Sequence, residues 1–286
     1  MPNIKINAPN KVHFFEENKM LPTIHLFGRQ IGLYVILAIC GALVAGTWAC
    51  YTARKRGYDD NPTVIILLFG ALGAFLGGFL LYGAFNFQLL LELMNNRAEY
   101  SFREFLVALR LVFGGTVFFG GLMGGLLGGF ITAQLMKLPL GEYADMLTPA
   151  IPLFHVFGRI GCFLAGCCFG VESNFGVVFQ NSLIAEANGV RRLPIQLVES
   201  ALNLLLFLLL AYLLKKNKWQ GRLLPLYIIL YSVMRFILEF WRGDTARGFV
   251  LGISTSQFIS LTLIILCVLF LVIQKIFNRR GVVAEE

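Results

Sequence analysis

The sequence predicts an all-α integral membrane protein with about seven transmembrane helices. Of its 286 residues, 57% are hydrophobic and only 14% are charged, and the mean hydropathy is +0.74. A soluble domain usually carries about a quarter charged residues. Apolar segments of roughly 20 residues, the length that crosses a bilayer, recur along the chain, with basic clusters between them. We therefore predict a single transmembrane domain over residues 1–286.

Seven apolar segments qualify as spans, and two of them are rich in glycine. The second and third contain "FGALGAFLGGFLLYG" and "GGTVFFGGLMGGLLGGF". Small residues at four-residue spacing let helices approach closely, so packing explains most of these glycines. The seven predicted spans cover about residues 28–51, 62–86, 112–136, 146–169, 196–214, 222–241 and 256–276.

Basic clusters set the predicted orientation. They follow the first, third, fifth and seventh spans, at residues 53–56, 137, 215–222 and 275–280. Lys and Arg are concentrated in cytoplasmic loops, so the N-terminal segment 1–26 is expected outside the cell and the C-terminus in the cytoplasm. This orientation accounts for the net charge of +8 without a nucleic-acid partner.

The connections 87–111, 171–195 and 242–255 then face outward. The first of them combines helical apolar spacing with interspersed charge. That pattern predicts a helix lying in the membrane interface. A surface-packed helix with no lipid role fits the same pattern almost equally well.

Charged side chains inside a span are costly and indicate function, and the fourth span carries several polar groups. His155, Arg159 and Cys162 occur at i, i+4 and i+7, which places them on one helix face. Cys167 and Cys168 follow about a turn later, near the predicted outer end. A histidine at this position is as often a hydrogen-bonded structural residue as a catalytic one.

The sixth span has a similar face. Tyr231, Arg235, Glu239 and Arg242 follow at i, i+4, i+8 and i+11, and Arg235 can pair with Glu239. If this face meets that of Arg159, three guanidinium groups share one carboxylate. That excess of positive charge predicts a bound anion. Phosphate fits best because guanidinium binds it through two parallel hydrogen bonds, and near a bilayer the commonest phosphate belongs to a lipid headgroup.

Cysteine placement leaves three interpretations open for the fourth span. The thiols of Cys167 and Cys168 could take part in redox or thiol chemistry, bind a metal or simply pack. We predict no metal site and no cofactor, because no other His or Cys is clustered at ligand spacing. On a continued helix the two side chains point about 100° apart, so Cys162 and Cys167 are expected to line one cavity. The remaining cysteines stand alone in apolar segments and are interpreted as small buried residues: Cys40, Cys50 and Cys267.

Several of these stretches together resemble the bacterial prolipoprotein diacylglyceryl transferases. "GRIGCFLAGCCFG" is similar to the family signature, roughly Gly-Arg-x-Gly-Asn-Phe-x-Asn-x-x-x-x-Gly. "LPIQLVES" is similar to His-Pro-x-Gln-Leu-Tyr-Glu, and "YSVMRFILEFWR" to Tyr-x-x-x-Arg-x-x-x-Glu-Phe-x-Arg. "FFGGLMGG" and "HLFGRQIGLY" resemble a His-Gly-Gly-Leu-x-Gly element and a first-span Tyr-Gly segment. The five stretches lie at 158–170, 193–200, 231–242, 118–125 and 25–34.

The resemblance implies a fold, a reaction and a location. Members of the family have seven spans, with the N-terminus outside the bacterial cytoplasmic membrane. They transfer the diacylglyceryl group of phosphatidylglycerol to a cysteine thiol of a lipoprotein precursor, and glycerol phosphate leaves. The resemblance implies catalytic roles for Arg159, Arg235 and Glu239. It also implies substrate-binding roles, for Tyr231, Arg242, Gly170, Gln196, Gly120 and Gly121.

This chain departs from the family pattern at polar positions. The signature Asn is Cys162, the second Asn is Ala165 and the next acidic position is Cys167. The two motif histidines are Phe119 and Leu193, while Val198 and Phe27 replace tyrosines. His155, one turn before Arg159, is therefore a candidate to replace a missing histidine, and Cys162 and Cys167 join the catalytic candidates.

Three functions remain open at this point. The leading one transfers the diacylglyceryl group to a prolipoprotein cysteine. A second keeps the same lipid donor and uses the cysteines to handle a different acceptor. A third is a non-catalytic protein that binds or transports anionic lipid. A transporter would more often show paired, inverted halves, and no such duplication is visible in the sequence.

Overall fold

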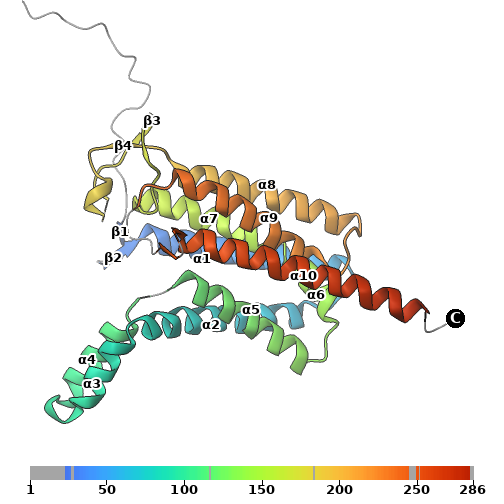
Figure 1. The fold of residues 1–286 in the computed structure, drawn as a ribbon, viewed down its shortest axis with the longest axis horizontal. Helices are drawn as coiled ribbons and strands as arrows, with labels where there is room; N and C mark the ends of the chain where they lie inside the picture. Colours follow the sequence, from blue (N-terminus) through green and yellow to red (C-terminus); the bar gives the residue numbers. More distant parts are fainter. Residues whose placement is uncertain are drawn as a thin grey trace, which may run out of the picture. The chain divides into compact units, whose positions relative to one another are not determined.

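The structure is a computed structural model that describes residues 23–26, 29–115, 117–182, 184–244, 249–250 and 252–283, and it is mainly helical (Figure 1). In this part of the chain, six helices have the length and apolar composition to cross a membrane, and a shorter apolar helix covers Gly120–Leu135. The predicted all-α, multi-pass fold is thus confirmed. The orientation of the termini stays a prediction.

The chain divides into two compact units. The first contains Met1–Ala42, Pro152–Leu206 and Ile228–Glu286, and the second contains Leu43–Ile151 and Phe207–Tyr227. The single transmembrane domain inferred from the sequence remains a prediction. Most of the predicted N-terminal outward segment, like Phe27, lies outside the described residues.

Helices α7 (Ala150–Ala165), α8 (Ile195–Lys215), α9 (Leu223–Leu238) and α10 (Thr255–Val283) supply the helical part of the first unit, with the start of α1 (Leu33–Lys55). Ser200 Oγ on α8 donates a hydrogen bond to the Val156 carbonyl on α7, at 3.0 Å. Gly41 of α1 lies against Phe157 of α7, where a Cβ would come within 2.7 Å of the Phe157 Cβ. These contacts show that the helices pack closely around α7.

Short antiparallel hairpins lie at one end of the first unit. They pair β1 (Thr23–Leu26) with β2 (Arg29–Gly32), β3 (Glu172–Val178) with β4 (Arg191–Arg192), and β5 (Phe249–Val250) with β6 (Ile253–Ser254). The connection 171–195 packs over a small apolar core of Phe169, Val177, Phe179 and Ala187. This core anchors the chain directly after the cysteine-containing motif.

Glycines bring two helices of the second unit into close contact. Helix α2 (Asp60–Phe85) packs along α5 (Phe118–Leu135). A Cβ on Gly124 would lie 2.1 Å from the Gly73 carbonyl oxygen, and one on Gly120 would lie 2.2 Å from that of Gly77. Only hydrogen fits at these positions, so the glycines serve backbone contact as predicted.

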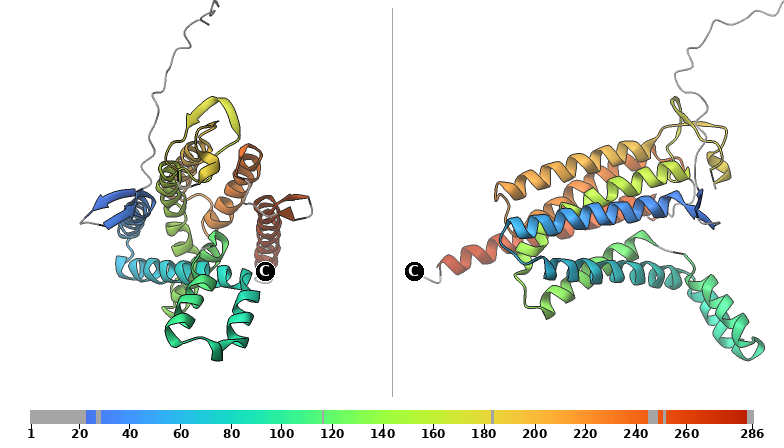
Figure 2. Two further views of the ribbon diagram at one scale, coloured as in Figure 1. Left: turned by 90° about the vertical axis from the view of Figure 1, so that its left-hand side faces the viewer. Right: turned by 180° about the vertical axis from the view of Figure 1, so that it is seen from behind.

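The segment 87–111 is not the single helix that the sequence predicted. It forms α3 (Phe87–Asn95) and α4 (Phe102–Phe113), folded back as a hairpin (Figure 2). The break has a local cause, because Ser101 and Glu104 form a reciprocal capping box that begins α4. The predicted role in the membrane interface is unaffected by the break and stays a prediction.

The predicted span 146–169 overlaps a helical run, Leu140–Ala165, that is long and apolar enough to cross a membrane, and this run is interrupted once. Helix α6 (Leu140–Leu147) is followed by Thr148 and Pro149, and α7 begins at Ala150 and ends at Ala165. Proline has no N–H to donate to the preceding turn, which explains the division. The third span begins later than predicted, since α5 begins at Phe118 rather than near residue 112, but its end at Leu135 agrees with the prediction.

Two predicted basic clusters lie together in the second unit. Arg56, at the end of the first span, donates a hydrogen bond to the Leu214 carbonyl and one of 2.7 Å to the Asn217 side chain. Asp145 accepts from the backbone N–H groups of Gly221 and Leu223 and thereby caps the start of α9. The clusters after spans one and five therefore share one side, as the charge pattern predicted.

Candidate functional site

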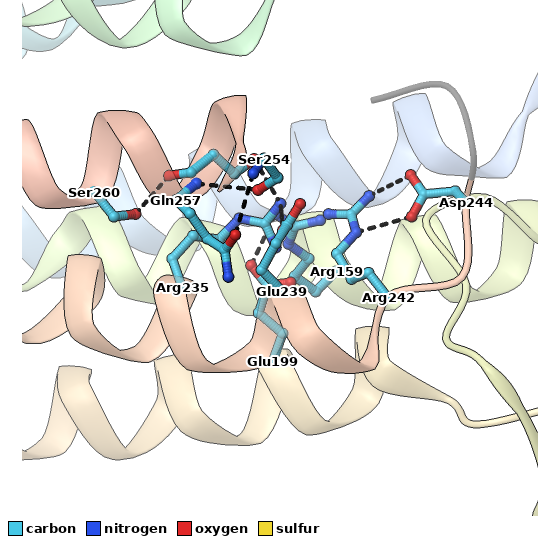
Figure 3. A network of polar contacts seen from close by, with 10 residues as sticks. Arg159, Glu199, Arg235, Glu239, Arg242, Asp244, Ser254, Gln257 and Ser260 are labelled. Carbon is cyan, nitrogen blue, oxygen red and sulfur yellow. Dashed lines mark hydrogen bonds and ion pairs between the residues drawn. The ribbon is translucent and has the colours of Figure 1, made fainter. Parts of the chain in front are cut away.

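Three largely buried arginines of the first unit each pair with a carboxylate (Figure 3). The first pair joins α7 to α8, the second lies at the end of α9, and the third lies just after α9. In the third pair, Arg242 Nε and Nη2 both donate to the same carboxylate, at 2.9 and 2.6 Å. Their N–O distances are 2.8 Å for Arg159–Glu199, 2.8 Å for Arg235–Glu239 and 2.6 Å for Arg242–Asp244.

The pairs are well shielded from the surroundings. The side chains of Glu199 and Glu239 are each 2% exposed, and that of Arg235 is 11% exposed. Arg242 interacts electrostatically with both Arg159 and Arg235, so the guanidinium groups form one cluster. Buried ions require such partners, because an unpaired charge loses its hydration without compensation.

The predicted excess of positive charge is wrong. The helix faces offered only one carboxylate, Glu239, for three arginines. In the structure, two further carboxylates, Glu199 and Asp244, pair with the other two arginines. Glu199 is a site residue that was not among the candidates predicted from the sequence. A usable signal was present, because an acidic residue lies inside an apolar span in "LPIQLVES". Charge balance alone therefore does not demand an anion at this site.

One buried donor remains available in the cluster. Arg235 Nη2 contacts Glu239 at 2.8 Å and donates to Ser256 Oγ at 3.1 Å. Its Nη1 is buried and has no hydrogen-bond partner among the described residues. A buried donor without a partner costs free energy, which an acceptor on a ligand would recover.

His155 contacts other side chains of the site. It hydrogen-bonds with the buried Asn203, and its ring lies 5.4 Å from that of Tyr231 between centroids. Tyr231 in turn hydrogen-bonds with Arg159. The structure thus brings together His155, Tyr231 and Arg159, as the helix faces predicted. It places His155 where it can orient Tyr231.

Backbone contacts fix the loop after α7 against Arg242. Gly170 N–H donates to the Leu193 carbonyl at 3.1 Å, and Val171 N–H donates to the Trp241 carbonyl at 2.9 Å. Gly170 also forms a bridge with Arg242. A Cβ on Gly170 would lie 2.5 Å from the Leu193 oxygen, so this position accepts only glycine.

Gln196, an expected substrate contact, supports the same loop. It is fully buried, and its Nε2 donates to the Cys167 carbonyl at 2.7 Å. The two other expected substrate contacts, Gly120 and Gly121, belong to the second unit, where they pack against α2. Their role in substrate binding stays a prediction.

Three thiols meet beside the arginines. The Sγ atoms of Cys162, Cys167 and Cys168 all lie within 4.8 Å of one another. Cys162 and Cys167 lie together as expected, and Cys168 joins them because the helix does not continue, which was the condition for keeping the adjacent pair apart. Helix α7 ends at Ala165, and Gly166 (φ +73°) and Cys168 (φ +56°) turn the backbone back.

Just beyond α7 and α9, electrostatics favour the charged forms of Arg242 and Cys168, whereas hydrogen bonds with Cys162 and Cys168, together with burial, raise the pKa of the Cys167 thiol. Burial disfavours the charged form of Arg242, but its hydrogen bonds to Asp244 outweigh this and raise the pKa of the guanidinium above its ordinary value. Hydrogen bonds from Cys162 and Cys167 lower the pKa of the Cys168 thiol, and Arg242 and Arg159 act in the same direction.

The isolated cysteines are less buried than expected. Cys40 is exposed, and Cys50 and Cys267 are partly exposed. In a membrane-spanning helix apolar side chains also face lipid, so hydrophobic character does not imply a buried position. All three lie on α1 or α10, outside the thiol cluster.

The fold and the site define a class, namely a multi-pass membrane protein with arginine–carboxylate pairs buried among its helices. The chain belongs to the prolipoprotein diacylglyceryl transferase family, whose model matches residues 22–273. It is accordingly a multi-pass protein of the bacterial inner membrane.

Relatives from several bacteria match nearly the whole chain. Phosphatidylglycerol–prolipoprotein diacylglyceryl transferase 2 of Clostridium perfringens is 34% identical over 90% of this chain and 93% of its own length. The transferase of Clostridium tetani is 35% identical over 84% and 92%, respectively. That of Dehalococcoides mccartyi is 30% identical over 85% and 88%.

Proposed function

We propose that this protein transfers the diacylglyceryl group of phosphatidylglycerol to the cysteine thiol of a prolipoprotein, with release of glycerol phosphate. The relatives carry that donor and acceptor in their names. The observation that carries the proposal is the buried cluster of Arg159, Arg235 and Arg242, which lies within the matched region.

The donor lipid supplies the acceptor atoms that this cluster lacks. Each guanidinium has five N–H donors, and a single carboxylate uses at most two or three of them. The buried Nη1 of Arg235, without a hydrogen-bond partner among the described residues, supports its assignment as a donor to a phosphodiester oxygen. Arg159 contacts Glu199 through Nη2 at 2.8 Å, and its other N–H groups contribute further donors to the same phosphate.

The reaction develops charge where these donors lie. When the glyceryl C–O bond breaks, its electron pair remains on the phosphate oxygen, and the leaving glycerol phosphate gains negative charge. Fixed guanidinium groups stabilise that charge without reorganising at the moment of reaction. Their stabilisation is greatest in the transition state, which lowers the barrier and not only the Michaelis constant.

The carboxylates keep the guanidinium groups in place. Glu199 and Glu239 are almost completely buried, so their role is to hold Arg159 and Arg235 rather than to meet the lipid. Tyr231, hydrogen-bonded to Arg159, and His155, whose tilted ring lies next to that of Tyr231, complete the support. In this assignment His155 is a positioning residue.

Purified protein, phosphatidylglycerol and a peptide with a lipoprotein-type cysteine test the proposal. Glycerol phosphate release and formation of the peptide thioether are measured together, with a Cys→Ser peptide as the control. Release that depends on the peptide thiol supports the proposal. Release with another thiol or hydroxyl acceptor assigns a different acceptor. Lipid binding without release makes the protein a lipid-binding one.

A further inference from the structure

We propose that Cys162, Cys167 and Cys168 bind a zinc ion whose fourth position receives the acceptor thiol, in departure from the sequence-based expectation of no metal site. This inference rests on the proposed function and adds to it the means by which the thiol is activated. The three Sγ atoms lie within 4.8 Å of one another. Tetrahedral zinc with Zn–S bonds of about 2.3 Å separates its sulfurs by roughly 3.8 Å, so small side-chain rotations complete the site.

The backbone holds the thiols in this arrangement. Cys167 N–H donates to the Cys162 carbonyl at 3.0 Å, which folds the chain back on the end of α7. Gln196 binds the Cys167 carbonyl from α8 at 2.7 Å. Cys168 adopts a left-handed φ of +56°, which costs a non-glycine residue free energy. A strained residue inside a fixed loop is typical of a functional site.

The support continues on the far side of the loop. Phe169, the next residue, is 1% exposed and belongs to the apolar core under the connection 171–195. The guanidinium of Arg192 stacks over its ring, 4.5 Å from the centroid. Gly170 is hydrogen-bonded to Leu193. Together these contacts prevent the two adjacent cysteines from turning away from Cys162.

Charged side chains lie close to the thiol cluster. Arg159 and Arg242 both interact electrostatically with Cys168. Three thiolates and one Zn²⁺ carry a net charge of −1, and the two guanidinium groups lie near it although each is already paired with a carboxylate.

Zinc is the metal that fits both ligands and reaction. Thiolates select zinc, copper(I) or iron–sulfur clusters among biological metals. Three protein ligands leave one position open, which is the arrangement of catalytic rather than structural zinc. The reaction transfers no electrons, and a redox-inert ion suits it.

The step balances without an oxidant or reductant. The acceptor R–SH displaces water from zinc and loses its proton to solvent, because a coordinated thiol is deprotonated. Its sulfur then attacks the glyceryl carbon bound to the phosphate oxygen. The S–C bond forms, the C–O bond breaks, and the electron pair leaves with glycerol phosphate. The neutral thioether is a weaker ligand, so water replaces it.

The arginines and the thiols thus bind different substrates. The guanidinium cluster binds the donor phosphate, and the thiol cluster holds the acceptor sulfur beside it. The family signature has Asn at the position of Cys162 and an acidic residue at that of Cys167. The metal site is therefore specific to chains that carry all three cysteines.

Metal content and spectroscopy of the full-length protein in detergent test the site. We expect one zinc per chain in the wild type and in the control Cys267→Ser, and loss of zinc in Cys162→Ser and Cys168→Ser. In the wild type, bound zinc should protect three of six cysteines from maleimide until a chelator is added. This second measurement requires no variant. Absence of zinc, a copper ion in its place, or a disulfide among the three cysteines would overturn the proposal.

The absorption spectrum of the cobalt-substituted protein and the rate of thioether formation test this inference and the proposed function separately. A cysteine peptide should change the thiolate–cobalt absorption, and a Cys→Ser peptide should not. Zinc removal should lower thioether formation on the order of 100-fold, with recovery on zinc addition. Full activity without metal overturns the inference and leaves the proposed function intact. Bound zinc and a spectral response to the peptide, without any thioether formation, leave the site intact and overturn the function.

Discussion

Arg159 on α7 and Glu199 on α8 form a buried ion pair with an N–O distance of 2.8 Å. The pair joins two helices that are distant in the chain, and it fixes the guanidinium that the signature motif supplies. Because Glu199 is 1% exposed, its charge is supported by Arg159 rather than by solvent. The ion pair is thus part of both the packing and the site.

Removal of one partner should therefore destabilise the protein. Glu199→Gln leaves Arg159 charged and without its carboxylate, and we expect a loss of about 3–5 kcal/mol in the free energy of unfolding. Thermal denaturation in detergent measures this as a lower melting temperature. The double variant Arg159→Gln/Glu199→Gln should be more stable than Glu199→Gln, since neither charge remains. A Glu199→Gln variant as stable as the wild type would contradict the pairing.

Replacement of Arg235 by lysine should abolish most of the transfer activity. An ammonium group at this position can still pair with Glu239, so the Arg235→Lys variant should fold. It loses the buried Nη1 donor, and we expect the transfer rate to fall on the order of 100-fold or more, as when a donor to transition-state charge is removed. The matched control is Arg191→Lys, at an exposed position of strand β4, which should retain activity. Equal rates in the two variants would exclude the phosphate contact.

The local parts of this structure could be predicted from the sequence. Hydropathy located the helices because burial in lipid depends on composition over about twenty residues. The i, i+4 spacing placed His155 with Arg159, and Arg235 with Glu239, since helix geometry alone decides those faces. The family resemblance, carried by several motifs, was confirmed over residues 22–273.

The parts that depend on backbone turns and on partners from distant segments were not predictable in this way. The pairing of Glu199 with Arg159 needs the packing of α8 on α7, which no local pattern reports. The meeting of Cys162 with Cys168 depends on where α7 ends and on the left-handed backbone at Gly166. The division at Pro149 was readable in principle, but a continuous apolar run obscured it.

The glycines between α2 and α5 should control stability according to the space around each. In Gly120→Ala the new Cβ would lie 2.2 Å from the Gly77 carbonyl oxygen, and we expect a loss of about 1–3 kcal/mol in stability. In Gly129→Ala the Cβ would meet only Ile66 Cγ2 at 3.5 Å, and the change should be neutral or stabilising by about 0.5–1 kcal/mol. Melting temperatures of the two variants decide, and a stable Gly120→Ala protein would refute the contact.

The orientation of the chain can be measured with cysteine reporters. Phe175 on β3 is 85% exposed and belongs to the predicted outward connection, whereas Lys216 lies in the basic cluster after α8. In intact cells, a membrane-impermeant maleimide should modify Phe175→Cys and leave Lys216→Cys unmodified until the cells are opened. The unsubstituted protein gives the background from native thiols. The reverse pattern would invert the predicted topology.

Two glycines of the signature motif should differ sharply, although both lie in "GRIGCFLAGCCFG". At Gly158 on α7, an alanine Cβ would have no neighbouring atom within 4 Å, whereas a Cβ on Gly170 would lie 2.5 Å from the Leu193 oxygen and 2.9 Å from the Leu193 Cβ. Alanine is also a better helix former than glycine by about 1 kcal/mol. Gly158→Ala should therefore keep the wild-type melting temperature or raise it, and it serves as the matched control for Gly170→Ala.

The Gly170→Ala change should push the loop after α7 away from Leu193 and Trp241. Since that loop carries the bridge to Arg242, we expect the transfer rate of Gly170→Ala to fall at least about 10-fold, roughly the effect of losing one supporting contact around a site. Rates and melting temperatures of both variants, measured side by side, separate a loss of positioning from a loss of stability. A fully active Gly170→Ala protein would show that the bridge does not position Arg242.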